Sequence, residues 1–134
     1  MVNSEVAGVM FTNNPATSSK DEILIQSSWG LGESVVSGRF GNDLFILDKA
    51  TLSLKKSIIG SKTEMIVYDQ EKGYGTRQVP VAHERIQLPS LSQPMLKELG
   101  AVGIRIENHF DTLQDIGWAY SQGKLFILQT RKAR

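Results

Sequence analysis

Apolar and β-branched residues recur in short runs along the first three-quarters of the chain, separated by clusters of glycine, proline and asparagine. In Glu22–Ser28, two isoleucines alternate with Leu24 and Gln26, which indicates a strand buried on both faces. The predicted strands are Val6–Thr12, Glu22–Ser28, Asn42–Asp48, Leu54–Ile59, Glu64–Tyr68, Thr76–Val81, Gln114–Tyr120 and Lys124–Arg131. Such closely spaced short strands are typical of a mostly antiparallel sheet, with a terminal hairpin formed by the last two.

One segment, between Ser92 and Phe110, has helical periodicity instead. Its apolar residues Leu96, Leu99, Ile106 and Phe110, with Gly103 between, fall at steps of three and four. Ser92 can accept the N-terminal hydrogen bond, and Pro94 is tolerated in a first turn. Gly100 and Gly103 weaken a helix by up to about 1 kcal/mol each relative to alanine, so we expect close packing against the sheet there. The predicted fold class is α+β, one sheet with one main helix packed on it.

The composition limits the classes of function. A chain of 134 residues forms one domain at most, here taken as residues 1–134. Fifteen Lys and Arg against fourteen Asp and Glu leave no basic face for nucleic acid and no polybasic membrane anchor. The absence of cysteine excludes a thiolate nucleophile and a Cys-ligated zinc site. No transmembrane run or basic leader is visible, so the expectation is a soluble cytoplasmic domain.

Two segments of the sequence contain residues that could bind a ligand or a metal ion. Gly30-Leu31-Gly32-Glu33 has two of the three glycines of a dinucleotide loop and lacks the Walker lysine, so it is either a strand-end turn that needs positive φ or an anion-binding loop. In the terminal hairpin, Asp115 can face Gln129 and Arg131, which point to one face of their strand. These three are either a surface ion pair with a neighbouring amide, or oxygen ligands for Mg²⁺ beside a phosphate-binding arginine.

Four segments carry a family resemblance. The chain resembles the phosphoenolpyruvate synthase (pyruvate, water dikinase) family over Gly8–Pro15, Ser28–Gly38, Gln114–Ala119 and Lys124–Arg131, in order and across nearly its whole length. Pyruvate phosphate dikinase and rifampicin phosphotransferase share the same nucleotide-binding domain. The resemblance implies an ATP-grasp fold, in which two lobes clamp ATP and Mg²⁺, and identifies this chain as the C-terminal lobe only, a single partial domain.

The resemblance also implies partners and roles. Met1 and Val2 would end the hinge against adenine, and the first lobe, the phosphohistidine domain and the pyruvate-binding barrel would lie outside the chain. By position, Gln129 and Asp115 correspond to metal and nucleotide ligands, and Arg131 to the catalytic arginine at the γ-phosphate. Gly117 departs from the pattern, because the family usually has a glutamate ligand there, twelve positions before Gln129.

The expected function follows from this resemblance. The chain would be the ATP- and Mg-binding fragment of an enzyme that phosphorylates a histidine and makes phosphoenolpyruvate from pyruvate and ATP, and alone it would be inactive. The alternatives are a fragment of a rifampicin phosphotransferase, or a degenerate non-catalytic binding or assembly module. An open lobe face would expose parts of Met10, Leu31 or Trp118 and could support a homodimer.

Overall fold

The computed structural model describes residues 5–13, 20–30, 42–60, 62, 64–68, 75–86 and 88–132 of the chain. The strands are β1 (Val6–Phe11), β2 (Glu22–Trp29), β3 (Asp43–Asp48), β4 (Leu54–Ile58), β5 (Glu64–Tyr68), β6 (Thr76–Pro80), β7 (Gln114–Ser121) and β8 (Lys124–Lys132). A short 3₁₀ helix, η1 (His83–Arg85), precedes the long helix α2 (Gln93–Phe110). Every predicted strand and the helix are therefore present, with ends that differ by at most one residue.

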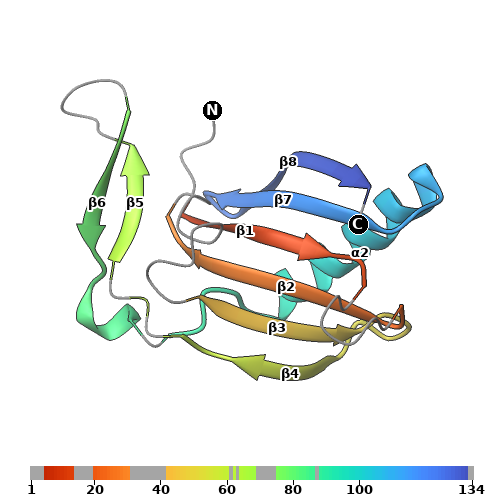
Figure 1. Cartoon of the computed structure of the whole chain (residues 1–134). Coiled ribbons are helices and arrows are strands. Elements are labelled where there is room, and N and C mark those ends of the chain that lie inside the picture. Colours follow the sequence, from red (N-terminus) through yellow and green to blue (C-terminus); the bar gives the residue numbers. More distant parts are fainter. Residues whose placement is uncertain are drawn as a thin grey trace.

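Six of these strands form one antiparallel sheet in the order β4-β3-β2-β1-β7-β8 (Figure 1). The helix α2 crosses one face of this sheet, and β5 and β6 form a separate two-stranded hairpin beside it. The first strand thus lies in the interior of the sheet, between β2 and β7, and it brings the N-terminal and C-terminal hairpins together. The described structure is α+β, as predicted from the sequence.

The helix begins and ends where its sequence indicates. The Ser92 hydroxyl accepts a hydrogen bond from the Met95 backbone N–H at 3.4 Å, and proline occupies the first turn. At the other end, Asp111 adopts a left-handed conformation with φ of 53°, and its backbone N–H returns to the Glu107 carbonyl. Among the described residues, no helix is both long enough and apolar enough to cross a bilayer.

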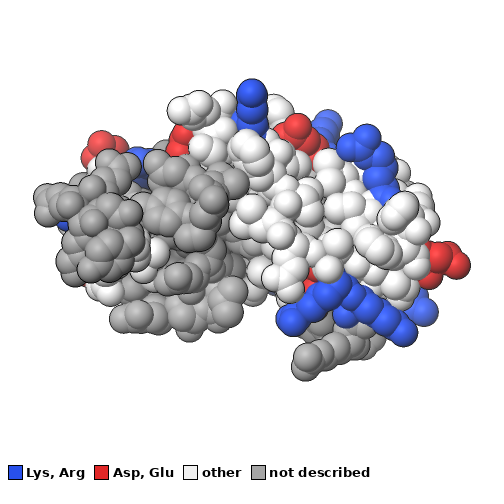
Figure 2. All heavy atoms as spheres, turned by 90° about the horizontal axis from the view of Figure 1, so that it is seen from above, with Lys and Arg blue, Asp and Glu red and all other residues white. Residues whose placement is uncertain are grey.

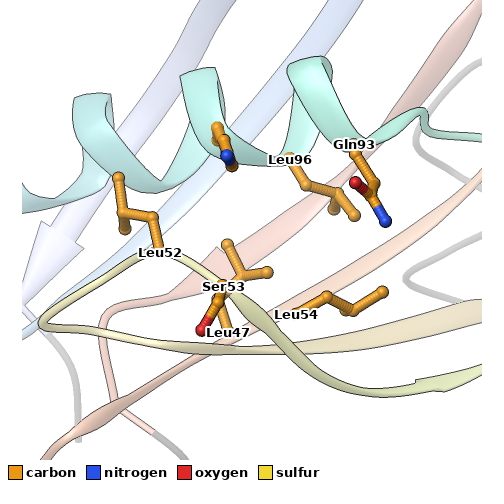
Figure 3. A pocket seen from close by; sticks show the side chains of 7 residues that line it. Leu47, Leu52, Ser53, Leu54, Gln93 and Leu96 are labelled. Carbon is orange, nitrogen blue, oxygen red and sulfur yellow. The ribbon is translucent and has the colours of Figure 1, made fainter.

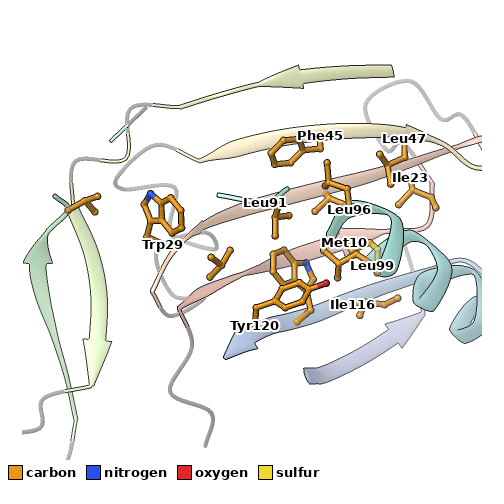
Figure 4. Close-up of a cluster of buried hydrophobic side chains, with 14 residues drawn as sticks. Met10, Ile23, Trp29, Phe45, Leu47, Leu91, Leu96, Leu99, Ile116 and Tyr120 are labelled. Carbon is orange, nitrogen blue, oxygen red and sulfur yellow. The ribbon is translucent and has the colours of Figure 1, made fainter. Parts of the chain in front are cut away.

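The two helix glycines let α2 approach the sheet closely. A Cβ atom on Gly103 would lie 3.0 Å from Met10 Cε on β1, and one on Gly100 would lie 3.2 Å from Leu47 Cδ1 on β3 and 2.8 Å from a methyl carbon of Leu52 in the β3–β4 turn. The core between the two layers, seen in Figure 4, contains Met10, Ile23, Phe45, Leu47, Leu96, Leu99, Ile116 and Trp118 among its buried residues. The packing role expected for Gly100 and Gly103 is confirmed by these contacts.

Trp118 is the largest side chain that is fully buried, and it lies against the backbone of β1. Its register partner on β1 is Gly8, and a Cβ atom there would come within 2.9 Å of Trp118 Cζ2 and 1.8 Å of the Gln26 carbonyl oxygen. Only glycine fits between the indole and the neighbouring strand. This contact fixes which residues of β7 face α2.

The expectation that Met10 and Trp118 are exposed on an open lobe face was wrong. Both are 0% exposed, because alternation along β1 and β7 directs them to the face that α2 covers. The sequence alone did not specify which face of these strands the helix covers. Leu31, the third residue in that expectation, lies outside the described residues.

The buried carboxylate of Asp43 on β3 binds two segments to the sheet, the one between β4 and β5 through Lys62 and the one before α2 through Ser90. Lys62 Nζ lies 2.6 Å from Asp43 Oδ1, and both side chains are fully buried. The second carboxylate oxygen of Asp43 accepts hydrogen bonds from the backbone N–H and the hydroxyl of Ser90, at 2.7 and 2.6 Å. Ser90 Oγ is in turn 2.6 Å from Ser27 Oγ on β2. Because each charge is met by an opposite charge or a hydrogen-bond donor, the cost of burying the pair is offset.

The β5–β6 hairpin joins the main sheet through Gly30. This glycine has φ of 80° and forms a parallel bridge with Ile66, whose carbonyl oxygen would lie 2.5 Å from an added Cβ. Gly30 thus has the positive φ that was expected at the end of this strand. The other residues of the glycine motif, Leu31 to Glu33, lie outside the described residues.

We predict that Gly8→Ala lowers the free energy of unfolding by about 3 kcal/mol or more, because its methyl group would overlap backbone and the Trp118 ring. Gly117→Ala is the matched control on the adjacent strand, where the added Cβ would meet nothing closer than 3.9 Å. It should be neutral or slightly stabilising. Urea unfolding of both variants measures the difference, and equal stabilities would contradict this account of the core.

Candidate functional site

The face of the sheet opposite α2 carries the candidate site. On β7, Ile116, Trp118 and Tyr120 are buried in the core, and since side chains alternate along a strand, Asp115 and Gly117 point to the other face. The predicted juxtaposition in the terminal hairpin is therefore observed, and packing of the core residues causes it.

The neighbouring strand places two more side chains beside them. Asp115 pairs with Arg131, and Gly117 pairs with Gln129, directly across the antiparallel β7–β8 ladder. After Gly117 the register shifts, because Trp118 pairs with Ile127, and Leu128 is the extra residue of a β-bulge. Asp115 and Gln129 are thus diagonal neighbours, a spacing that long side chains can bridge.

These residues line a hollow of about 300 Å³ on the open face. Asp115, Gln129 and Arg131 form its polar part, and the remaining lining residues are Gly8, Val9, Phe11, Ile116, Gly117, Trp118 and Leu128. The combination of an apolar floor with a few convergent polar groups is typical of small-molecule sites.

Arg131 and Asp115 form a loose ion pair. Arg131 Nε lies 3.6 Å from Asp115 Oδ2, and the arginine side chain is 62% exposed against 19% for the aspartate. Such a partly exposed pair contributes little to stability. A guanidinium has five N–H donors in a planar fork, so Arg131 can bind an anion without leaving its carboxylate partner.

A hydrogen-bonded clamp on the α2 side holds the strands in register. The Thr130 hydroxyl donates to Gln114 Oε1 at 2.7 Å, and the Gln114 backbone N–H donates to Thr12 Oγ1 at 2.9 Å. Thr12 and Gln114 are buried. The clamp lies one residue from Asp115 and from both Gln129 and Arg131. The sequence analysis missed it, although polar residues at core-facing strand positions were a usable signal.

Gly117 is not required by the backbone. A Cβ atom there would meet only Gln129 atoms, at 3.9 and 4.0 Å, which is ordinary van der Waals contact. Its φ lies outside the left-handed region that favours glycine. The position can therefore hold a side chain facing the hollow, and the present residue supplies no oxygen ligand there.

Other candidate positions are separate from this hollow. Met1 and Val2 lie outside the described residues. A second hollow, of about 280 Å³, lies between α2 and the β3–β4 turn and is lined by leucines with Ser53, Gln93 and Lys97 (Figure 3). In the described part of the chain, no three His, Cys, Asp or Glu side chains group closely enough to hold a metal ion.

The model of one protein family, described as the pyruvate phosphate dikinase AMP/ATP-binding domain, matches residues 1–134. The chain belongs to this family. The open-face hollow is therefore part of an AMP/ATP-binding domain. The family expected from the sequence motifs is confirmed.

Curated relatives agree with the family. The chain is 44% identical over 137 residues to a probable phosphoenolpyruvate synthase of Pyrococcus horikoshii, and 44% identical over 131 residues to that of Methanocaldococcus jannaschii. It is also 37% identical over 131 residues to the prodigiosin synthesizing transferase PigC of Serratia marcescens. Each comparison covers 98% of this chain but only 17%, 11% and 14% of the relative. The chain thus spans a small part of the relatives that it matches.

We predict that Thr130→Val lowers the free energy of unfolding by about 1–2 kcal/mol, because it leaves the buried Gln114 oxygen without its hydroxyl donor. Thr130→Ser keeps the hydroxyl and should cost clearly less. Urea unfolding gives the energies, and amide hydrogen exchange should show faster exchange at the end of β8 in the valine variant only. Equal behaviour of the two variants would show that the clamp does not hold β8.

Proposed function

We propose that this chain supplies the metal- and phosphate-binding half of a MgATP site in a phosphoenolpyruvate-synthase-like phosphotransferase. The observation that carries the proposal is the register of β7 and β8, which gathers Asp115, Gln129 and Arg131 around one hollow on the open face. The family match supports a nucleotide as the ligand, since the domain of this family is described as AMP/ATP-binding.

The donor set fits Mg²⁺. This ion takes oxygen ligands, usually one or two carboxylates together with substrate phosphates and several waters. The Asp115 carboxylate and the Gln129 amide oxygen are such ligands, and they are diagonal neighbours across two strands. We propose that these two residues hold the ion, whose charge would offset that of the phosphates.

Arg131 is proposed to act at the terminal phosphate. Its guanidinium is largely exposed at the hollow, and planar N–H donors match phosphate oxygens in a bidentate manner. Charge spreads over the phosphoryl oxygens during transfer, so a fixed cation beside them stabilises the transition state. In this proposal Asp115 orients Arg131, because the two face each other across the ladder.

The remaining parts of the reaction are assigned to protein outside this chain. We propose that the chain is the C-terminal lobe of an ATP-grasp clamp, with Met1 and Val2 next to adenine and a first lobe closing over the phosphates. Transfer to a histidine and then to pyruvate would use further domains. The coverage of 17% of the P. horikoshii relative is consistent with such domains, and the isolated chain is expected to be inactive.

Gly117 favours a second candidate, a domain that keeps the fold for binding or assembly without catalysis. A Cβ atom at this position would make only ordinary van der Waals contacts, yet the residue is glycine and supplies no carboxylate. A rifampicin phosphotransferase fragment is a third candidate, and the relatives from Pyrococcus, which are named as phosphoenolpyruvate synthases, favour the first candidate over it.

We predict that Arg131→Gln weakens ATP binding in the presence of Mg²⁺ by about tenfold or more, since a charge-assisted phosphate contact contributes roughly 1.5–3 kcal/mol. AMP binding should change less, because AMP has no terminal phosphates. Lys132→Gln is the matched control: it removes the same charge one residue further along β8, on the opposite face. Nucleotide titration followed by NMR measures both, and equal losses would refute the assignment of Arg131.

We predict that Gly117→Glu strengthens Mg²⁺-dependent ATP binding, because the added carboxylate enters the hollow beside Asp115 and Gln129 without steric conflict. Gly117→Gln, of nearly the same size but uncharged, should give a much smaller gain. Titrations with and without Mg²⁺ separate metal-dependent from metal-independent binding. No gain with glutamate would place the metal elsewhere and would favour the non-catalytic candidate.

A further inference from the structure

Lys49, in the turn after β3, directs its charge into the protein. On the β8 side of the molecule, lysine and arginine side chains extend outward from the surface (Figure 2). The Lys49 side chain is instead only 17% exposed. Its ammonium group donates to the carbonyl oxygens of Thr12 and Lys20, at 2.7 and 3.3 Å, and to Glu107 Oε1 on α2, at 2.6 Å. Because an ammonium group has three donors, all of them are used, and they hold both ends of the β1–β2 connection to the helix.

Thr12 connects Lys49 to β7. The Thr12 backbone N–H donates to the Gln114 carbonyl oxygen at 3.1 Å, and the Gln114 N–H donates to Thr12 Oγ1 at 2.9 Å. The Gln114 side chain donates to the Thr112 carbonyl oxygen, and the Thr112 N–H donates to the Glu107 carbonyl oxygen, each at 3.3 Å. Together with Lys49, these residues form a closed ring of hydrogen bonds that joins α2, the β3–β4 turn, the end of β1 and the start of β7.

This ring lies at the end of the strand ladder that carries Asp115. In the β1–β7 register Asp115 pairs with Phe11, which is the last pair at that end. The ends of strand ladders open most easily, so a carboxylate there is held less firmly than one in the middle. Asp115 directly follows Gln114, which the ring binds. Gly117 pairs with Val9 inside the ladder and has no need of such support.

We propose that Lys49 is a positioning residue for the candidate site, which fixes the Asp115 carboxylate through Thr12 and Gln114. The inference rests on the proposed function, since it concerns the metal ligand that Asp115 is proposed to be. Lys49 is not a catalytic residue, because it does not line the hollow and its ammonium group binds Glu107 on the α2 side of the sheet. Groups that support metal ligands typically contribute roughly 10–100-fold to metal affinity or activity.

The variant Lys49→Met tests the proposal, because it removes the charge and all three donors at nearly constant length. In the free chain, amide hydrogen exchange should become faster at Thr12 and Gln114, while amides in the middle of β7 keep their wild-type rates. Nucleotide titration followed by NMR should show ATP binding with Mg²⁺ weakened by about tenfold. AMP binding should change little, since AMP has no terminal phosphates to share the ion. Lys49→Arg keeps a cation with N–H donors and should retain most of the Mg²⁺-dependent binding.

Lys55→Met is the matched control. Lys55 also pairs with a glutamate, since its Nζ lies 2.7 Å from Glu22 Oε2, but it lies on β4 and its side chain is 50% exposed. The substitution removes the same charge and one ion pair without touching the ring. Exchange at Gln114 and Mg²⁺-dependent ATP binding should both stay as in the wild type.

Thr12→Val breaks the next connection of the ring. It keeps the carbonyl oxygen that Lys49 binds and removes only the Oγ1 acceptor of the Gln114 N–H. Mg²⁺-dependent ATP binding should weaken to a similar extent as in Lys49→Met. Because both changes interrupt one path, the double variant should lose clearly less than the sum of the two losses in binding free energy. Fully additive losses would show that Lys49 does not act through Thr12 and would overturn the proposal.

Three further results would overturn the proposal and leave the proposed function in place. They are unchanged exchange at Gln114 in Lys49→Met, faster exchange with unchanged Mg²⁺-dependent ATP binding, and equal losses of AMP binding and of ATP binding with Mg²⁺. Failure of the proposed function is distinguishable from these, because the wild-type chain itself would then show no Mg²⁺-dependent ATP binding. That result would overturn both.

Discussion

The packing of the Trp118 indole against the bare backbone of Gly8 is the contact on which the rest of the structure depends. It places the largest buried side chain of β7 under α2 and brings β1, β2 and β7 together at a point where any side chain on residue 8 would collide with Gln26. Once Trp118 faces the helix, the two-residue period of a strand leaves no choice for its neighbours. Asp115 and Gly117 must lie on the other face.

The polar side chains of the candidate site on the open face all come from one pair of strands, β7 and β8. Antiparallel pairing sets Arg131 opposite Asp115 and Gln129 opposite Gly117, and the partly buried Gln114–Thr130 hydrogen bond on the α2 face of the sheet holds that register. The site is therefore positioned by groups that take no part in its chemistry. The middle of β8, the outer strand of this hairpin, is apolar and partly exposed at Phe126, Ile127 and Leu128.

Much of this could be predicted from the sequence, because the signals were local. The strands, the helix with its Ser92 cap, and the close packing at Gly100 and Gly103 follow from short-range patterns. The face of the sheet that α2 covers could not be predicted from such patterns. Met10 and Trp118 lie on strands with apolar residues on both faces, and the sequence analysis expected both side chains to be exposed. The Lys62–Asp43 ion pair could not be predicted either, because only the fold brings its two partners together.

The site itself was predictable for a different reason. Asp115, Gln129 and Arg131 were selected by family motifs, and the structure brings them together; their roles remain proposals. The most direct test is paramagnetic broadening of amide signals with ATP and Mn²⁺, which substitutes for Mg²⁺. The account predicts selective broadening around Asp115, Gly117 and Gln129. Broadening centred on the hollow between α2 and the β3–β4 turn, or none on β7 and β8, would contradict it.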